Sequence, residues 1–298
     1  MMREPQTIDF SALPRTAIDA EIEGKLVLAD NFGKKPSEHL HVTPMSAPVK
    51  LNMSLIFLCA EGNMTIKINL QEYTLTPHHI ATITFNSFMQ IMEMSNDFKG
   101  YFIAISKDFV DYSQDFRIGL ALIHQHYEIP FAHLNDKNYQ DAIDIYHLLK
   151  RKLNDPDYLY KEQVTRNYLN ILRYNGLQAI QEGVELNQPL IANHKDDMLQ
   201  QFKSLVKTHY RTERQVTFYA SKMGITPKYL STIIKEVSGK FANDWINEFV
   251  ILEAKALLKN SDMPIKNICE ELHFLNTSIF TKYFKQHTGF TPKEYRTL

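Results

Sequence analysis

Two histidines near the N-terminus have the spacing of metal ligands. Gly33 is followed, after five residues, by His39-Leu40-His41, the start of a G-x5-H-x-H metal motif of β-barrels. Imidazoles at alternate strand positions can meet one metal ion. The motif then needs a glutamate four or five residues on, and the chain has Met45 and Ser46 there. We therefore expect no metal, although a metal-dependent enzyme of the cupin class remains the alternative interpretation.

Other catalytic chemistry has less support in the sequence. The chain contains no P-loop, G-x-G-x-x-G, H-E-x-x-H or G-x-S-x-G pattern. His78 and His79 follow Pro77 at a predicted turn, where a ligand lining a barrel is not expected. We predict no catalytic residue and no cofactor, and therefore expect the protein to act by binding other molecules.

Short hydroxyl and lysine side chains gather on the open faces of two predicted helices near the C-terminus. Hydroxyl groups can reach base edges, and lysine can bond guanine acceptors or phosphate. This chemistry favours a surface that contacts double-stranded DNA, with an ordinary solvated helix face as the alternative. The two faces carry Lys228, Ser231, Thr232 and Lys235 in the first helix, and Thr277, Ser278, Thr281, Lys282 and Lys285 in the second.

These two helices belong to an internal repeat. Residues 234–239 match residues 284–289 at an offset of 50, whereas Gly224 matches His273 at an offset of 49, so the second copy has one extra residue after its turn. Each copy has a short helix, a turn and a second helix, the order of a helix-turn-helix. The short helices are predicted at 215–223 and 264–272.

The second helix of each copy has clear boundary signals. In the first copy, Thr226 is a good N-cap and Pro227 suits the first position of a helix that runs to Val237. In the second copy, a helix over 276–287 is predicted to bury four side chains and to leave the hydroxyl and lysine face open. The four are Ile279, Phe280, Tyr283 and Phe284.

A predicted helix over 241–259 joins the copies. At 1.5 Å per residue it is roughly 28 Å long. Successive major-groove windows on one face of B-DNA lie ~34 Å apart. The linker thus has about the length needed to hold two helices in successive grooves.

The repeat resembles the AraC/XylS family of bacterial transcription regulators over residues 195–298. The resemblance implies a sequence-specific DNA-binding regulator whose base-reading helices also include Tyr229. His273 stands where the family has glycine, which suggests a strained turn. The signature positions are Ile265, Ile268, Cys269, His273, Phe274, Phe280, Phe284, Lys285, Gly289, Thr291, Pro292, Tyr295 and Arg296.

The N-terminal part has a different pattern. Short β-rich runs recur between residues 25 and 106, and amphipathic helices follow at 138–153 and 158–181. With the resemblance, this order implies a cupin-like barrel and a helical dimerisation segment. We therefore predict an α+β fold with a sensor and dimerisation domain over 1–183 and an all-α DNA-binding domain over 194–298.

Charge and composition agree with an intracellular DNA-binding protein. The net charge is −1, yet residues 195–298 hold 16 Lys+Arg against 11 Asp+Glu, which leaves 17 basic and 23 acidic residues elsewhere. A basic C-terminal third, joined to an acidic remainder of the chain, favours a polyanionic partner for the C-terminal part. Cys59 and Cys269 give no disulfide framework. No signal peptide or spanning segment is evident, so we expect a cytoplasmic protein without a membrane partner.

A β-barrel mouth lined by apolar side chains with a few polar groups is a common ligand site. We therefore predict a small-molecule effector in the N-terminal domain, with His39, His41 and Tyr101 as candidate polar contacts. The other expected partners are a second copy of the chain and RNA polymerase. Candidate lining residues are Phe57, Ile66, Ile68, Phe85, Ile91, Phe102 and Ile105.

Overall fold

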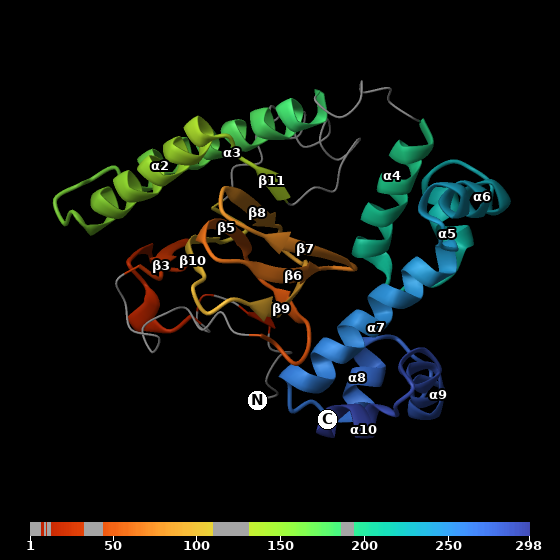
Figure 1. The fold of residues 1–298 in the computed structure, drawn as a ribbon. Helices are drawn as coiled ribbons and strands as arrows, with labels where there is room; N and C mark the ends of the chain where they lie inside the picture. Colours follow the sequence, from red (N-terminus) through yellow and green to blue (C-terminus); the bar gives the residue numbers. More distant parts are fainter. Residues whose placement is uncertain (1–6, 9, 11–12, 33–43, 110–130, 186–193) are drawn as a thin grey trace.

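The computed structural model describes residues 7–8, 10, 13–32, 44–109, 131–185 and 194–298, and confirms the predicted α+β class (Figure 1). Strands fill the described part of the chain up to residue 133, and helices follow. The strands are β1 (Thr7–Ile8), β2 (Ala20–Ile22), β3 (Leu26–Asp30), β4 (Val49–Leu51), β5 (Ser54–Glu61), β6 (Met64–Ile68), β7 (Gln71–Leu75), β8 (His79–Ile83), β9 (Phe88–Met94), β10 (Lys99–Ile105) and β11 (Phe131–His133), with a 3-10 turn at Arg15–Ala17.

The strands form two sheets that face each other. One has the order β1-β4-β9-β6-β7 and the other β11-β8-β5-β10-β3-β2. All described pairings are antiparallel except that of β1 with β4. Among the described strands no ladder joins the two sheets, so the barrel-like domain is built as a sandwich.

Period-two alternation decides which side chains fill the space between the sheets. Five of the predicted lining residues lie there: Phe57, Ile66, Ile68, Ile91 and Phe102. Ile105 points to the opposite face of its sheet, and Phe85 is only half-buried outside this core. The ring of Phe57 meets that of Phe102 edge to face at 5.2 Å between centroids, which is a preferred aromatic geometry.

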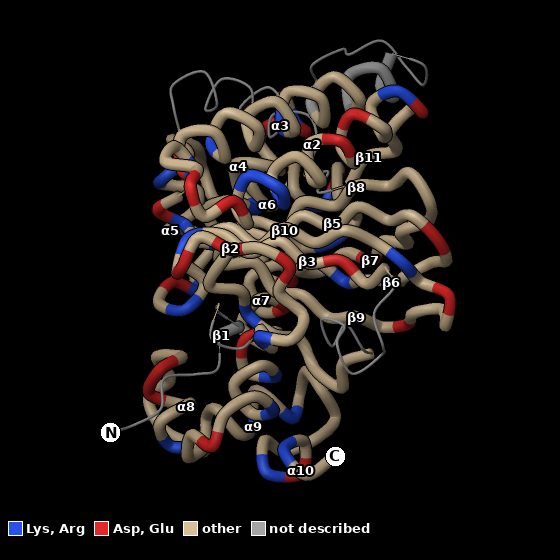
Figure 2. Tube along the Cα trace, turned by 90° about the vertical axis from the view of Figure 1, so that its left-hand side faces the viewer, with Lys and Arg blue, Asp and Glu red and all other residues tan. Residues whose placement is uncertain are grey.

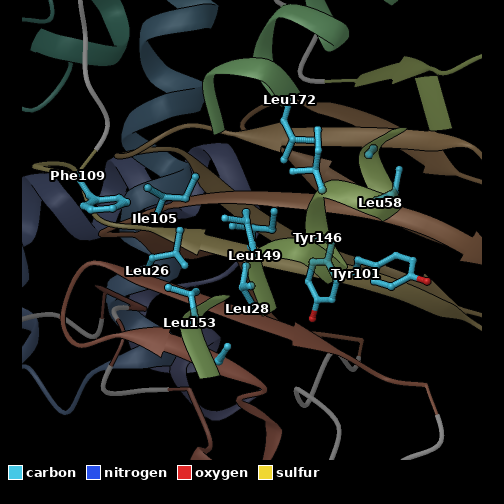
Figure 3. Close-up of a cluster of buried hydrophobic side chains, with 14 of the residues drawn as sticks. Leu26, Leu28, Leu58, Tyr101, Ile105, Phe109, Tyr146, Leu149, Leu153 and Leu172 are labelled. Atoms are coloured by element: carbon cyan, nitrogen blue, oxygen red, sulfur yellow. The ribbon is translucent and has the colours of Figure 1, made fainter. Parts of the chain in front are cut away.

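Helices cover the outer face of the second sheet. α2 (Asp136–Asn154) places Tyr146, Leu149 and Leu153 on the leucines of β3 and on β10, as Figure 3 shows. Asn135 caps α2 by accepting a hydrogen bond from the Asn138 amide. α3 (Lys161–Glu185) lies along α2. Both helices agree with the predicted amphipathic segments.

The remaining helices follow residue 193. They are α4 (His194–His209), α5 (Val216–Lys222), α6 (Pro227–Ser238), α7 (Ala242–Asn260), α8 (Ile265–Glu271), α9 (Thr277–Thr288) and α10 (Pro292–Thr297). The predicted repeat helices and linker agree with α5 to α9 within two residues. In the described part of the chain, no helix is long and apolar enough to cross a bilayer.

Helix α7 is the centre of the C-terminal domain. Its N-terminal half, with Trp245 and Phe249, packs in one core with α4, α5 and α6. Its C-terminal half, with Ala254 and Leu258, packs in a second core with α8 and α9. Because one rigid helix contributes to both cores, the spacing of the two repeat units is fixed.

Candidate nucleic-acid interface

The turn of each repeat unit has the backbone conformation that the sequence suggests. Gly224 has φ of 68° and His273 has φ of 54°. In the first turn the Ile225 amide donates to the Ala220 carbonyl at 3.0 Å, and in the second the Phe274 amide donates to the Cys269 carbonyl at 2.9 Å. Since only glycine adopts positive φ at no steric cost, the His273 turn carries backbone strain.

The helices after these turns begin on side-chain caps. Thr226 accepts a hydrogen bond from the Tyr229 amide at 3.2 Å, and Asn276 accepts one from the Ile279 amide at 2.9 Å. Pro227 occupies the first helical position, as predicted. The caps fix where α6 and α9 start and therefore which side chains stand in their first turns, where helix-turn-helix proteins contact bases.

The predicted DNA-contacting residues lie on the open faces of α6 and α9. Leu230 and Ile234 of α6, and Phe280 and Phe284 of α9, are buried on the opposite faces. Ser231 and Thr281 are half-buried, and the others are exposed. The exposed ones are Lys228, Tyr229, Thr232, Lys235, Thr277, Ser278, Lys282 and Lys285.

Ile279 differs from the prediction. It was expected in the core, yet its side chain is 44% exposed. Leu275, just before the cap of α9, is 92% exposed. Ile279 was assigned to the core because an apolar residue in a helical pattern was assumed to face inward, although apolar atoms are common on surfaces. No prediction was made for the exposure of Leu275.

Some polar groups on α6 already bond within the protein. The Thr232 hydroxyl donates to the Lys228 carbonyl at 2.9 Å. The Lys235 ammonium donates to the Gly239 carbonyl at 2.6 Å and lies 4.2 Å from the centroid of the Phe241 ring. Lys235 thus stabilises the C-terminal end of its helix. Among the described contacts, the ammonium group of Lys228, in the first turn of α6, makes no comparable hydrogen bond.

The two helices occupy one side of the molecule. Figure 1 shows α6 and α9 at opposite ends of α7, both turned away from the sheets. In the view of Figure 2, turned by 90°, α6 lies above α9. Figure 2 also shows lysines and arginines along α6 and near α10. With 19 residues, α7 is roughly 28 Å long.

Two arginines in the segment between α4 and α5 fix the second unit to the first. Arg211 donates to Glu253 on α7 at 2.7 Å and to Glu271 on α8 at 2.7 Å. The guanidinium of Arg214 lies 3.9 Å from the centroid of the Phe274 ring and donates to the Leu272 carbonyl. No sequence pattern pointed to these roles, because they join segments about 40 to 60 residues apart.

The same carboxylate connects the helical domain to the sheets. Glu253 is buried, with 2% of its side chain exposed, and accepts a hydrogen bond from Lys50 of β4 at 3.1 Å. Burial alone would raise the pKa of Glu253, but hydrogen bonds from Arg211 and the charge of Lys50 hold it below its ordinary value. Lys50, Arg211, Glu253 and Glu271 are named the interdomain network below.

Further contacts extend this interface. The Lys207 ammonium donates to the hydroxyls of Ser87 at 2.9 Å and of Thr84 at 3.0 Å. The Asn260 amide donates to the Pro48 carbonyl at 2.8 Å. Phe88 at the start of β9 is buried among the side chains of the helical core. The first sheet therefore packs directly on α4 and α7.

Of the three predicted effector contacts, the structure describes only Tyr101. His39 and His41 lie outside the described residues. Tyr101 is on the face of its sheet that α2 covers, with its ring 4.8 Å from that of Tyr146 between centroids (Figure 3). Burial, followed by the charge of Asp30, raises the pKa of Tyr101. Among the residues that the structure describes, no cluster of three metal-ligating side chains occurs.

The C-terminal part of the chain matches known proteins. A family model described as "Helix-turn-helix domain" matches residues 219–297. The regulatory protein PocR of Salmonella typhimurium is 31% identical over 101 residues, which are 34% of this chain and 33% of that protein. The arabinose operon regulatory protein of the same organism is 26% identical over 137 residues, 46% of this chain and 47% of that protein.

The chain thus spans about a third to a half of the length of these relatives. Among solved structures, that of ToxT from Vibrio cholerae is similar with a TM-score of 0.46 and 15% identity, and the match covers 92% of this chain and 98% of that one.

Proposed function

Because the C-terminal domain of this chain is a helix-turn-helix domain of the AraC/XylS type, we propose that the whole protein is a sequence-specific, DNA-binding transcription regulator that reads two successive major grooves. One observation carries the proposal: α6 and α9 present hydroxyl and lysine faces on one side of the molecule, at the two ends of a rigid helix. Its place would be the cytoplasm, where its DNA lies.

Selection from a pool of random duplexes by the full-length protein tests this function. We expect enrichment of one bipartite sequence, bound much more tightly than random DNA. Binding should weaken steeply with salt, because each neutralised phosphate releases a counterion. A protein that enriches no sequence, even at low salt, would rule out the proposed function.

The division into domains belongs to the same proposal. We place the sensor and dimerisation domain at 1–183 and the DNA-binding domain at 194–298. The hydrophobic cores support this division. Side chains of the sheets and α2 form two of the buried clusters, and side chains of α4 to α9 form two others. Phe88 lies in the helical core and Leu70 packs against it, so both belong to the interface between the two parts.

A small organic effector in the N-terminal domain is the regulatory part of the proposal. The apolar lining residues that gather between the sheets support it, whereas Tyr101 lies on the opposite face of its sheet, under α2. An effector must bind two domain arrangements with different affinity to change DNA binding. Thermal-shift screening of metabolites, followed by measurement of DNA affinity in the presence of any hit, tests this proposal. A tightly bound metal in the wild-type protein that is lost in the variant with His39→Ala and His41→Ala would favour the metal-dependent enzyme instead.

A homodimer is proposed through α2 and α3, because α3 leaves apolar side chains outside. Ile171 and Tyr174, one turn apart, are 45% and 48% exposed. Changing both to glutamate should leave the fold intact and shift the sedimentation of the full chain from dimer to monomer. A wild-type protein that sediments as a monomer at tens of micromolar contradicts this proposal. RNA polymerase is the remaining proposed partner.

A further inference from the structure

The structure shows which residue of the second repeat unit is the extra one. Ile225 and Phe274 occupy the same place in their turns, since each amide donates to the carbonyl five residues earlier. In the first unit the cap Thr226 follows Ile225 at once, whereas in the second Leu275 stands between Phe274 and the cap of α9. Leu275 therefore has no counterpart in the first unit.

The insertion places an aliphatic side chain in solvent beside the N-terminal end of α9. Leu275 is 92% exposed, and Ile279, in the first turn of the helix, is 44% exposed. The first unit differs at both places: Ile225 is partly buried in the helical core, and Tyr229 stands where the second unit has Ile279. Only the second unit thus presents aliphatic groups next to its base-reading positions.

The surroundings of these groups identify their partner as DNA. The hydroxyl residues Thr277 and Ser278 lie between them in sequence, and Lys282 and Lys285 follow on the exposed surface of the same helix. Lysines suit a phosphate backbone better than the apolar surface of a protein partner. In the major groove, the apolar feature that distinguishes one base pair from another is the C5 methyl group of thymine.

On the basis of the proposed function, we propose that Leu275 and Ile279 are specificity-determining residues that contact thymine methyl groups, so that the half of the operator read by α9 is selected for thymine. The α6 half has different chemistry at the corresponding positions, because Lys228 ends in an ammonium group and Tyr229 in a phenol, and neither is a branched aliphatic side chain. Lys228 can bond the O6 and N7 acceptors of guanine. The two halves of the operator are therefore asymmetric, because the thymine methyls that Leu275 and Ile279 contact lie in the α9 half only.

Replacing thymine by deoxyuridine tests this contact, since it removes only the methyl group. The probe is the duplex that the full-length protein selects from a random pool, with each thymine changed in turn. Burial of one methyl contributes roughly 0.8 kcal/mol. We expect about fourfold weaker binding at one or two positions, all in the α9 half, because 1.4 kcal/mol corresponds to about tenfold.

The same substitutions are then repeated with protein variants. For Leu275→Ala with Ile279→Ala, the effect of deoxyuridine should fall to less than about twofold. The matched control is Leu159→Ala, an equally exposed leucine (85%) outside the C-terminal domain, which should keep the full effect. Leu275→Ala alone serves as a second variant, because so exposed a side chain contributes little to folding.

Three outcomes would overturn the inference. One is binding to the selected duplex that is insensitive to deoxyuridine at every position. Another is sensitivity that persists in the double variant. The third is a protein that selects no duplex, which would remove the proposed function together with this inference. In the first two cases the protein still binds its selected DNA, so the proposed function stands and only the assignment of Leu275 and Ile279 to thymine is lost.

Discussion

Among single residues, Lys228 has the clearest role. It is exposed at the second position of α6, while the neighbouring Lys235 is engaged at the other end of the helix. Lys228→Ala should cost roughly 1–3 kcal/mol on the selected duplex and little on random DNA. Titrations of both duplexes measure this difference. Lys137→Ala, an exposed lysine of α2, is the control, and an equal loss on both duplexes would make Lys228 a phosphate contact.

Glu253 is the residue on which the interdomain network depends. Removing its charge leaves the half-buried Lys50 and Arg211 beside a neutral group, and since an uncompensated, fully buried charge costs about 3–5 kcal/mol, we expect a loss of about 3 kcal/mol here. Glu253→Gln should therefore lower the free energy of unfolding by that amount in denaturant titrations. Glu248→Gln, which removes a partner of Lys240 from the exposed side of the same helix, should cost less than about 1 kcal/mol.

The lowered pKa of Glu253 gives this stabilisation a pH dependence. A carboxylate whose folded pKa lies below its unfolded value stabilises the fold fully above the unfolded pKa, and the contribution disappears as pH falls through the folded pKa. The difference between wild type and Glu253→Gln should thus be constant near neutrality and shrink in acid. A difference that grows as the pH falls would contradict the assignment.

At the scale of elements, the two turns provide a reciprocal test. His273 has φ of 54° without being glycine, and a left-handed conformation costs most residues roughly 1–2 kcal/mol. His273→Gly should raise the free energy of unfolding by about 1 kcal/mol, after allowing for the larger entropy of unfolded glycine. Gly224→Ala, at φ of 68°, should lower it by a similar amount.

Thermal unfolding of the two variants measures both changes. A neutral or destabilising His273→Gly would show that the Nδ1 contact of His273 with the Glu271 carbonyl, at 3.1 Å, matters more than the backbone strain. Because a methyl group added at Gly224 would meet no atom within 4 Å, the effect of Gly224→Ala reports backbone conformation alone.

The local elements were largely predictable. Caps, the proline at the start of α6 and the 3.6-residue period placed α5 to α9 within two residues, because each signal acts within one helix. β3 and the strands from β5 to β10 were also expected from short β-rich runs. β1, β2, β4 and β11 were missed as separate strands, since two or three residues are too few to show a period.

The candidate site was predictable at positions where burial follows the helical period. Lys228 and Thr277 were placed on open faces in this way. Ile279 was not, because the helical pattern assigned this apolar residue to the core, and the exposure of Leu275, in the turn before α9, was not predicted. Whether any predicted residue contacts DNA stays a prediction.

At the scale of the whole molecule, the sequence could not show how the sheets meet the helices. Lys50 and Glu253 are 203 residues apart, and their pairing depends on the tertiary fold alone. The interdomain network runs from β4 through α7 to Glu271 at the end of α8, the first helix of the second unit. A change in the sheet domain that moves Lys50 would therefore act on the helices that hold α9.

The proposed function rests above all on the separation of the two recognition helices by α7, and binding to duplexes of altered spacing tests it most directly. In the selected duplex, the two halves should lie about one helical turn, roughly 10 bp, apart. Inserting about 5 bp, half a turn, between them moves one half to the opposite face of the DNA. We expect affinity then to fall to that of a duplex with one half scrambled, while the same insertion outside both halves has no effect. Unchanged affinity after the central insertion would contradict a rigid spacing of α6 and α9 across two grooves.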